Sequence, residues 1–144
     1  MNLDAIYEVL AEEARQGKTA GHRGQMYYSD LSDRYYKKTG DWHEPHGSWD
    51  DPLGELNRIL HCVGWPALSA VVVLGSGDHK GEPGGGFWES SPNVPARPSN
   101  DIDRVTLYSR ILRDVLDRPW PETTPLAPPP PRPAKAATAK GKKR

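Results

Sequence analysis

The apolar run Leu68–Leu74 constrains the fold more than any other segment, because it is the only strongly apolar, β-branched stretch in the sequence. The run is too short to supply the core of a helix and is typical of a buried strand. Glycines follow it up to Gly84–Gly86, where positive φ angles and close backbone approach are permitted. We therefore predict a β-hairpin, or wing, whose far strand is anchored by Phe87 and Trp88.

Four amphipathic helices accompany this hairpin. Apolar residues recur at three- and four-residue steps, and capping residues, prolines and glycines mark the helix ends. Ser29 is the expected N-cap of the second helix, and Asn100 pairs with Asp103 at the start of the fourth. The predicted helices cover residues 3–16, 30–38, 51–63 and 101–118, with a short strand at 26–28.

The order helix, strand, helix, helix, strand and wing predicts an α+β, winged-helix-like domain over residues 1–122. It has three helices, a β-hairpin wing and an added C-terminal helix. A length of 144 residues fits one domain, and an apolar fraction of 35% implies a small core.

Residues 123–144 are predicted to form a disordered tail rich in proline, alanine and lysine. Because the whole chain has a net charge of zero and the tail has no acidic residue, the remaining body is acidic. A flexible cationic tail can neutralise phosphates and release their counterions. Its basic residues are Arg132, Lys135, Lys140, Lys142, Lys143 and Arg144.

The single cysteine, Cys62, excludes an internal disulfide and a zinc site built from several thiolates. We expect it to be a small buried side chain in the third helix, in a protein of the reducing cytoplasm. The N-terminus has no signal-peptide pattern, and no apolar run approaches membrane-spanning length. No cofactor and no membrane partner are predicted.

Four short motifs resemble the DNA-binding half of the alkylguanine alkyltransferases and alkyltransferase-like proteins. They are Tyr28–Leu31, Leu53–Leu56, Pro66–Val72 and Gly84–Phe87. The resemblance covers residues 3–88 and implies a DNA-binding winged-helix fold. Alkyl transfer in that family needs a thiolate directly after the proline, where this chain has Ala67. The resemblance therefore implies no alkyl transfer, and we predict a non-catalytic protein.

A second set of motifs resembles a family of small bacterial proteins that has no established activity. The motifs are Tyr28–Leu31, Leu56–Ile59, Pro66–Val73, Pro83–Phe87 and Trp120. This resemblance spans residues 3–120. It implies the same fold and adds no activity.

The predicted nucleic-acid interface consists of basic residues in loops, at helix ends and at the wing tip. Asp50, Asp51 and Glu55 near the start of the third helix would repel phosphate, so we expect little reading of base sequence. We therefore predict binding of duplex DNA through the wing and the tail. The body residues of this interface are Lys18, Arg23, Arg34, Lys37, Lys38, Arg58, His79 and Lys80.

The alternative is a protein-interaction module, such as an adaptor, an inhibitor or an immunity-type partner. Aromatic side chains are favoured anchors at protein interfaces, and here they would act beside an acidic face. The aromatic residues that we expect to be exposed are Tyr27, Tyr35, Tyr36, Trp42 and Trp49.

Other chemistry-bearing residues have a simpler interpretation. His43, Glu44 and His46, which His61 or His79 could join, lie in a predicted loop and are expected to be ordinary loop residues, not metal ligands. Ser69 is expected to pack in the buried strand. The triglycine Gly84–Gly86 is followed by no helix start or lysine, as a phosphate-binding loop would require.

Overall fold

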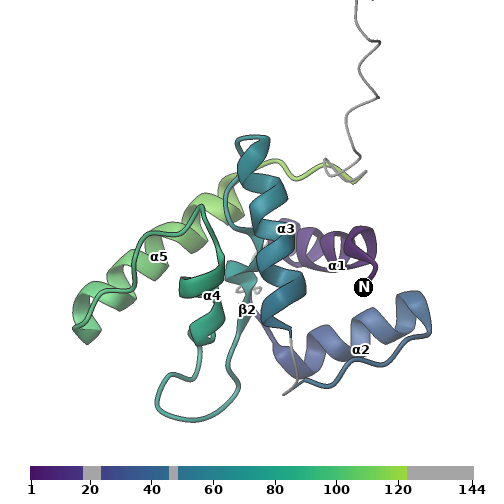
Figure 1. Ribbon diagram of the computed structural model, residues 1–144, viewed down its shortest axis with the longest axis horizontal. Helices are drawn as coiled ribbons and strands as arrows, with labels where there is room; N and C mark the ends of the chain where they lie inside the picture. Colours follow the sequence, from purple (N-terminus) through teal and green to yellow (C-terminus); the bar gives the residue numbers. More distant parts are fainter. Residues whose placement is uncertain (18–23, 46–48, 123–144) are drawn as a thin grey trace, which may run out of the picture.

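A computed structural model describes residues 1–17, 24–45 and 49–122, and these form an α+β fold of five α-helices around a two-stranded sheet (Figure 1). The sheet and a short 3-10 helix lie at the centre, and the helices surround them. The elements are α1 (Leu3–Gln16), β1 (Met26–Tyr27), α2 (Tyr28–Thr39), α3 (Asp50–Cys62), η1 (Leu68–Val71), β2 (Val72–Val73), α4 (Gly85–Ser90) and α5 (Asp101–Asp117).

Helix α1 has the predicted bounds, and its apolar face is buried. Ile6, Val9 and Leu10 are fully buried, which matches their three- and four-residue spacing. The Asn2 side chain caps the helix by accepting a hydrogen bond from the Ala5 amide at 3.0 Å. The local pattern is therefore sufficient to specify this helix.

The sheet is parallel, with Met26 paired to Val72 and Tyr27 paired to Val73. The predicted strand at 26–28 is confirmed in position, but only the end of the apolar run is a strand, because Leu68–Val71 form the 3-10 helix η1. Leu68 and Val71 are completely buried there. Burial of the run on all sides, and not strand pairing, accounts for its apolar composition.

The predicted far strand of the hairpin is wrong, because Phe87 and Trp88 lie in helix α4. Both side chains are buried. A pair of buried aromatic residues can occur in a helix as well as in a strand, so the pair does not distinguish the two. A loop still projects between β2 and α4 (Figure 1). Leu74 closes it by donating to the Glu82 carbonyl at 2.8 Å and accepting from the Gly81 amide at 2.9 Å. We call residues 74–82 the closed loop.

Helix α2 begins two residues earlier than predicted, and Ser29 is not its cap. Tyr27 is the N-cap residue, and its amide donates to the Asp30 carboxylate at 3.0 Å. Gly40 ends the helix with φ of 78°, a left-handed conformation that favours glycine.

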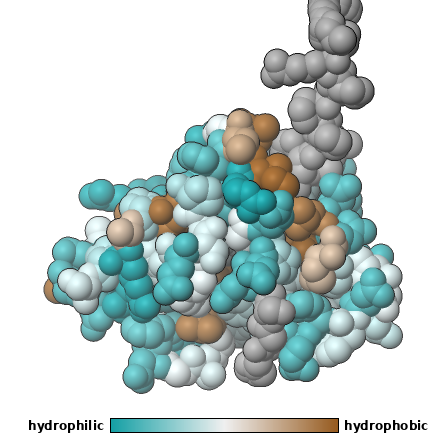
Figure 2. Space-filling view, viewed as in Figure 1, coloured by the Kyte–Doolittle hydropathy of each residue, from teal (hydrophilic) through white to brown (hydrophobic). Residues whose placement is uncertain are grey.

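Helix α5 closes the structure and begins with the predicted cap. Asn100 accepts from the Asp103 amide at 2.8 Å. Tyr108 and Val115 form its buried face, and Trp120 then donates from its indole nitrogen to the Val115 carbonyl at 2.7 Å. No helix in the described ranges is long and apolar enough to span a bilayer. Figure 2 shows one largely hydrophilic face, with apolar side chains gathered over the C-terminal end of α3.

Candidate functional site

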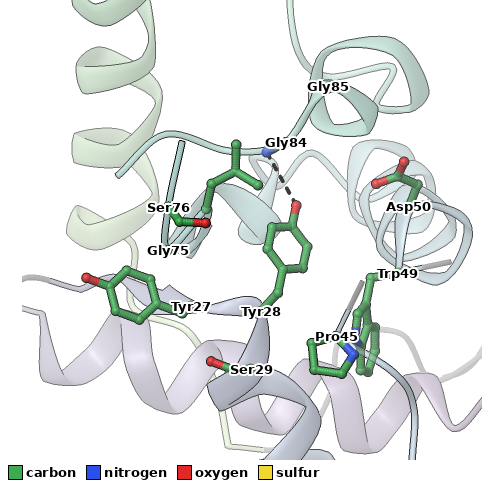
Figure 3. Close-up of a pocket in the computed structure, with 11 residues that line it drawn as sticks. Tyr27, Tyr28, Ser29, Pro45, Trp49, Asp50, Gly75, Ser76, Gly84 and Gly85 are labelled. Carbon is green, nitrogen blue, oxygen red and sulfur yellow. Dashed lines mark hydrogen bonds between the residues drawn. The ribbon is translucent and has the colours of Figure 1, made fainter. Parts of the chain in front are cut away.

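A cleft of about 580 Å³ opens where the two strands end (Figure 3). Because β1 and β2 are parallel, their carboxyl ends meet at one edge of the sheet, which is where open parallel sheets bind ligands. The start of α2, the residues after β2 and the start of α3 complete its walls. Its lining residues are Tyr27, Tyr28, Ser29, Pro45, Trp49, Asp50, Leu74, Gly75, Ser76, Gly84 and Gly85.

Tyr28 points across the middle of this cleft (Figure 3). Its hydroxyl accepts a hydrogen bond from the Gly84 amide at 3.4 Å. Burial raises the pKa of Tyr28, the Gly84 hydrogen bond opposes the rise, and the negative charge of Asp50 adds to it. The phenol is therefore neutral at physiological pH and keeps its O–H donor.

Asp50 supplies the negative charge of the cleft. Its carboxylate lies close to Gly86, where a Cβ would overlap it, so glycine permits this approach without a shift of the Asp50 side chain. The Asp50 carboxylate makes no ion pair or hydrogen bond with any residue in the described ranges. Asp50 is exposed, so a carboxylate without a counter-charge in the described part of the chain lies at the edge of an aromatic cleft.

The aromatic residues differ from their predicted exposure in two cases. Tyr27, Tyr36 and Trp42 are exposed, at 42%, 51% and 55%. Tyr35 and Trp49 are buried instead, because their rings pack edge to face at 5.6 Å and the Trp49 indole donates to Ser32 Oγ at 3.0 Å. A polar partner inside the core explains why Trp49 is not a surface anchor.

Most of the predicted phosphate-contacting residues in the helices are paired with carboxylates. Arg34 bonds to Glu12 at 2.8 Å and to Glu13 at 3.0 Å. Lys38 lies 3.3 Å from Glu8, and Arg58 pairs with Glu55 on the same helix. Lys37 has no such partner among the described residues. Lys18, Arg23 and the six basic tail residues lie outside the described ranges.

The predicted wing-tip residues have different surroundings. His79 lies in the closed loop with Nδ1 3.3 Å from Arg104 Nη2 and 3.8 Å from the Glu82 carboxylate. Lys80 forms no ion pair within the described part of the chain. The structure therefore leaves Lys80, but not His79, available at this loop.

Arg104 is a structural residue that the sequence analysis missed. Its side chain is buried and pairs with Glu82 at 2.7 Å and with Asp101 at 2.8 Å. The hydrogen bonds that it donates to Glu82 and then to Asp101 raise its pKa above the usual arginine value. Arg104 precedes buried Tyr108 by four residues, so its position on the inner face of α5 is the sequence signal that could have identified it.

Two arginines on the opposite face of α5 were also missed. Arg110 and Arg113 are exposed and make no ion pair in the part of the chain that the structure describes. They line a shallow hollow of about 560 Å³ together with Val105, Thr106, Ser109 and two acidic residues, Asp114 and Asp117. Their three-residue spacing, out of phase with Tyr108 and Val115, predicts this shared outer face.

The C-terminal half of α5 lies beside the described residues that border two basic segments of the sequence, residues 18–23 and residues 123–144. A Cβ on Gly17 would lie 2.7 Å from Gly24 Cα and 2.8 Å from a Leu116 methyl, so the residues bordering 18–23 meet on α5. The chain after α5 is held by Tyr7, whose hydroxyl donates to the Pro121 carbonyl at 2.6 Å. Burial raises the pKa of Tyr7 to about 12, against the opposing charge of Arg15.

The histidines and the cysteine that could have formed a metal site or a reactive group lie in separate surroundings. His43 packs on the Trp49 ring with centroids 4.2 Å apart, and its Nε2 is buried with no hydrogen-bond partner among the described residues. His46 lies outside the described ranges, within which no three His, Cys, Asp or Glu side chains converge as a metal site. Cys62 is exposed, contrary to the prediction, because it lies in the last turn of α3 away from the core.

Ser69 is buried as expected, but in η1 and not in a strand. The Asn57 amide donates to Ser69 Oγ and to Ser91 Oγ, both at 2.7 Å. This cluster joins α3, η1 and the end of α4. The triglycine also differs from its prediction, because Gly84 is the N-cap of α4 and a helix does follow it.

Comparison with protein-family models, with curated proteins and with solved structures finds no match.

Proposed function

We propose that this protein is a cytoplasmic, winged-helix-like binding protein that contacts the phosphate backbone of nucleic acid and catalyses no reaction. The observation that carries the proposal is that Arg110 and Arg113 form no ion pair with any described residue. They lie on the same half of α5 where the basic segments at 18–23 and after residue 122 join the body. Neutralising phosphates requires cations that are not already paired with carboxylates.

The charge distribution supports backbone contact over base reading. Asp50 and Asp51 are exposed at the start of α3, and the one arginine of that helix, Arg58, pairs with Glu55. A helix with these charges would repel the phosphates that flank a groove. The closed loop adds Lys80 in the place expected of a wing. Binding would therefore depend strongly on salt and weakly on sequence.

A titration of fluorescent duplex DNA at several salt concentrations tests this proposal. Each lost phosphate contact lowers the slope of log K against log salt by about 0.9, so Arg110→Gln combined with Arg113→Gln removes about two units of slope. Deleting residues 128–144 removes more. Arg58→Gln is the matched control and leaves the slope unchanged. The proposal fails if micromolar protein does not bind at low salt, or if the deletion changes neither affinity nor slope.

A second candidate function is protein interaction, favoured by one exposed aromatic pair. Tyr36 and Trp42 pack edge to face at 6.3 Å and are both about half exposed. Aromatic pairs of this kind anchor interfaces because they bury a large area at a small cost in conformational entropy. A stoichiometric protein captured from native lysate after nuclease treatment, and lost with Trp42→Ala, would favour this function over nucleic-acid binding.

A further inference from the structure

The cleft at the strand ends combines three properties that select one class of ligand. Tyr27 presents a partly exposed ring against Gly75, and Tyr28 presents a neutral phenol across the middle. Pro45 and the edge of Trp49 form the opposite side (Figure 3). Asp50 adds a carboxylate that has no counter-charge among the described residues. Aromatic walls with one unpaired acid suit an apolar ligand that carries a positive charge.

Proline-rich segments followed by a basic residue have this chemistry. Polyproline II chains dock in aromatic-lined grooves, because the pyrrolidine rings pack on aromatic faces and little conformational entropy is lost. A guanidinium next to the prolines can pair with a carboxylate in a forked geometry. The cleft presents both kinds of partner within one hollow.

The chain itself contains such a segment. Four consecutive prolines, Pro128–Pro131, are followed directly by Arg132. In a polyproline II conformation the chain from Glu122 to Arg132 spans roughly 31 Å, at about 3.1 Å per residue. A compact domain of this size has a radius of gyration of about 14 Å and a width of roughly 36 Å, so the segment spans most of the width of the body.

We propose that the aromatic cleft binds Pro128–Arg132 of the same molecule, with the prolines on Tyr27 and Tyr28 and with Arg132 paired to Asp50. The charges are complementary, since the cleft has an unpaired acid and the tail has only basic residues. Arg132 also belongs to the predicted phosphate-contacting residues, whereas Asp50 and Tyr27 do not, so Asp50→Asn tests this contact without removing a residue of the proposed nucleic-acid interface.

Paramagnetic relaxation in the full chain tests this contact. With Cys62→Ser to remove the exposed thiol, a nitroxide is attached to Ala134→Cys, two residues after Arg132. We expect the amide signals of Gly75, Ser76 and Gly85 to be attenuated, and those of Thr106 and Ser109 on the outer face of α5 to be unaffected. Uniform attenuation, or none at the cleft, would overturn the proposal.

Two charge variants and one control make the test specific. Asp50→Asn and Arg132→Gln each remove the ion pair, and a partly exposed pair is worth up to about 1 kcal/mol, so the bound-to-free ratio falls by up to about fivefold. Asp51→Asn changes a neighbouring acid that does not line the cleft, and attenuation persists. An unchanged pattern in Asp50→Asn would contradict the proposal, and so would attenuation that disappears on dilution.

Discussion

The inner and outer faces of α5 each carry arginine, but the two faces have opposite roles. Arg104 on the inner face is buried between Glu82 and Asp101, and it fixes the closed loop to the helix. Arg110 and Arg113 on the outer face are exposed and have no carboxylate partner in the described residues. The difference shows that a partner, more than position in the sequence, decides whether a basic residue is available to a ligand.

The largest expected effect comes from removing the inner arginine. Arg104→Met leaves Glu82, a largely buried carboxylate, without its counter-charge, and it releases the closed loop from α5. We expect the greatest fall in Tm among these variants, together with faster amide exchange in residues 74–82. Arg110→Met is the control. An equal Tm for the two variants would show that the inner arginine contributes no more to stability than the outer one.

Tyr108→Phe tests the inner face without changing charge. The Tyr108 hydroxyl donates to the Ala70 carbonyl at 2.8 Å and accepts from the Gln25 side chain at 2.9 Å. Loss of these bonds inside the core should lower the free energy of unfolding by about 1–2 kcal/mol. Urea unfolding measures the change, and a variant as stable as the parent would mean that the inner face depends on packing alone.

Unfolding at alkaline pH tests the hydrogen bond from Tyr7 to the Pro121 carbonyl, beside the C-terminal end of α5. The pKa of Tyr7 rises from 10.0 to about 12 on folding, so the unfolded chain loses this proton first. Its contribution to stability is complete below pH 10 and is lost as the pH rises to 12. Urea unfolding between pH 10 and pH 12 should show that the free energy of unfolding falls less steeply with pH in Tyr7→Phe than in the parent. Identical pH dependences would contradict the raised pKa of Tyr7.

The smallest expected effect on stability belongs to the outer face. Arg110→Gln combined with Arg113→Gln breaks no ion pair or side-chain hydrogen bond within the described ranges, so the free energy of unfolding should change by less than about 0.5 kcal/mol. Thermal unfolding of this variant, set beside its DNA titration, separates folding from binding. A large fall in Tm would show that the outer arginines are structural as well.

Local patterns specified much of the fold. Helix α1 has its predicted bounds, and the Asn100 cap of α5 is confirmed, because both depend on residues a few positions apart. The run after Pro66 is predicted to be a strand but forms mainly the 3-10 helix η1, which is fixed by Asn57 twelve residues earlier and by burial among α1, α3 and α5. Neither influence is visible in a window of neighbouring residues.

The candidate sites depended still more on distant contacts. The pairing of Arg34 with Glu12 and Glu13 joins two helices, and it turned a predicted phosphate contact into an internal ion pair. The cleft exists because β1 and β2, separated by more than forty residues, run in the same direction. Charge and aromatic content could be read from the sequence, but which charges remain unpaired could not.

The contact between Gly17 and Gly24 on Leu116 has a practical consequence for protein engineering. Two chain positions that already touch can accept a longer connection at little cost, since doubling the length of a closed loop costs only about 0.6 kcal/mol. An affinity tag or a fluorescent domain inserted between them would leave both chain termini native. Such an insertion would give a label on this protein that changes neither its first helix nor its basic C-terminus.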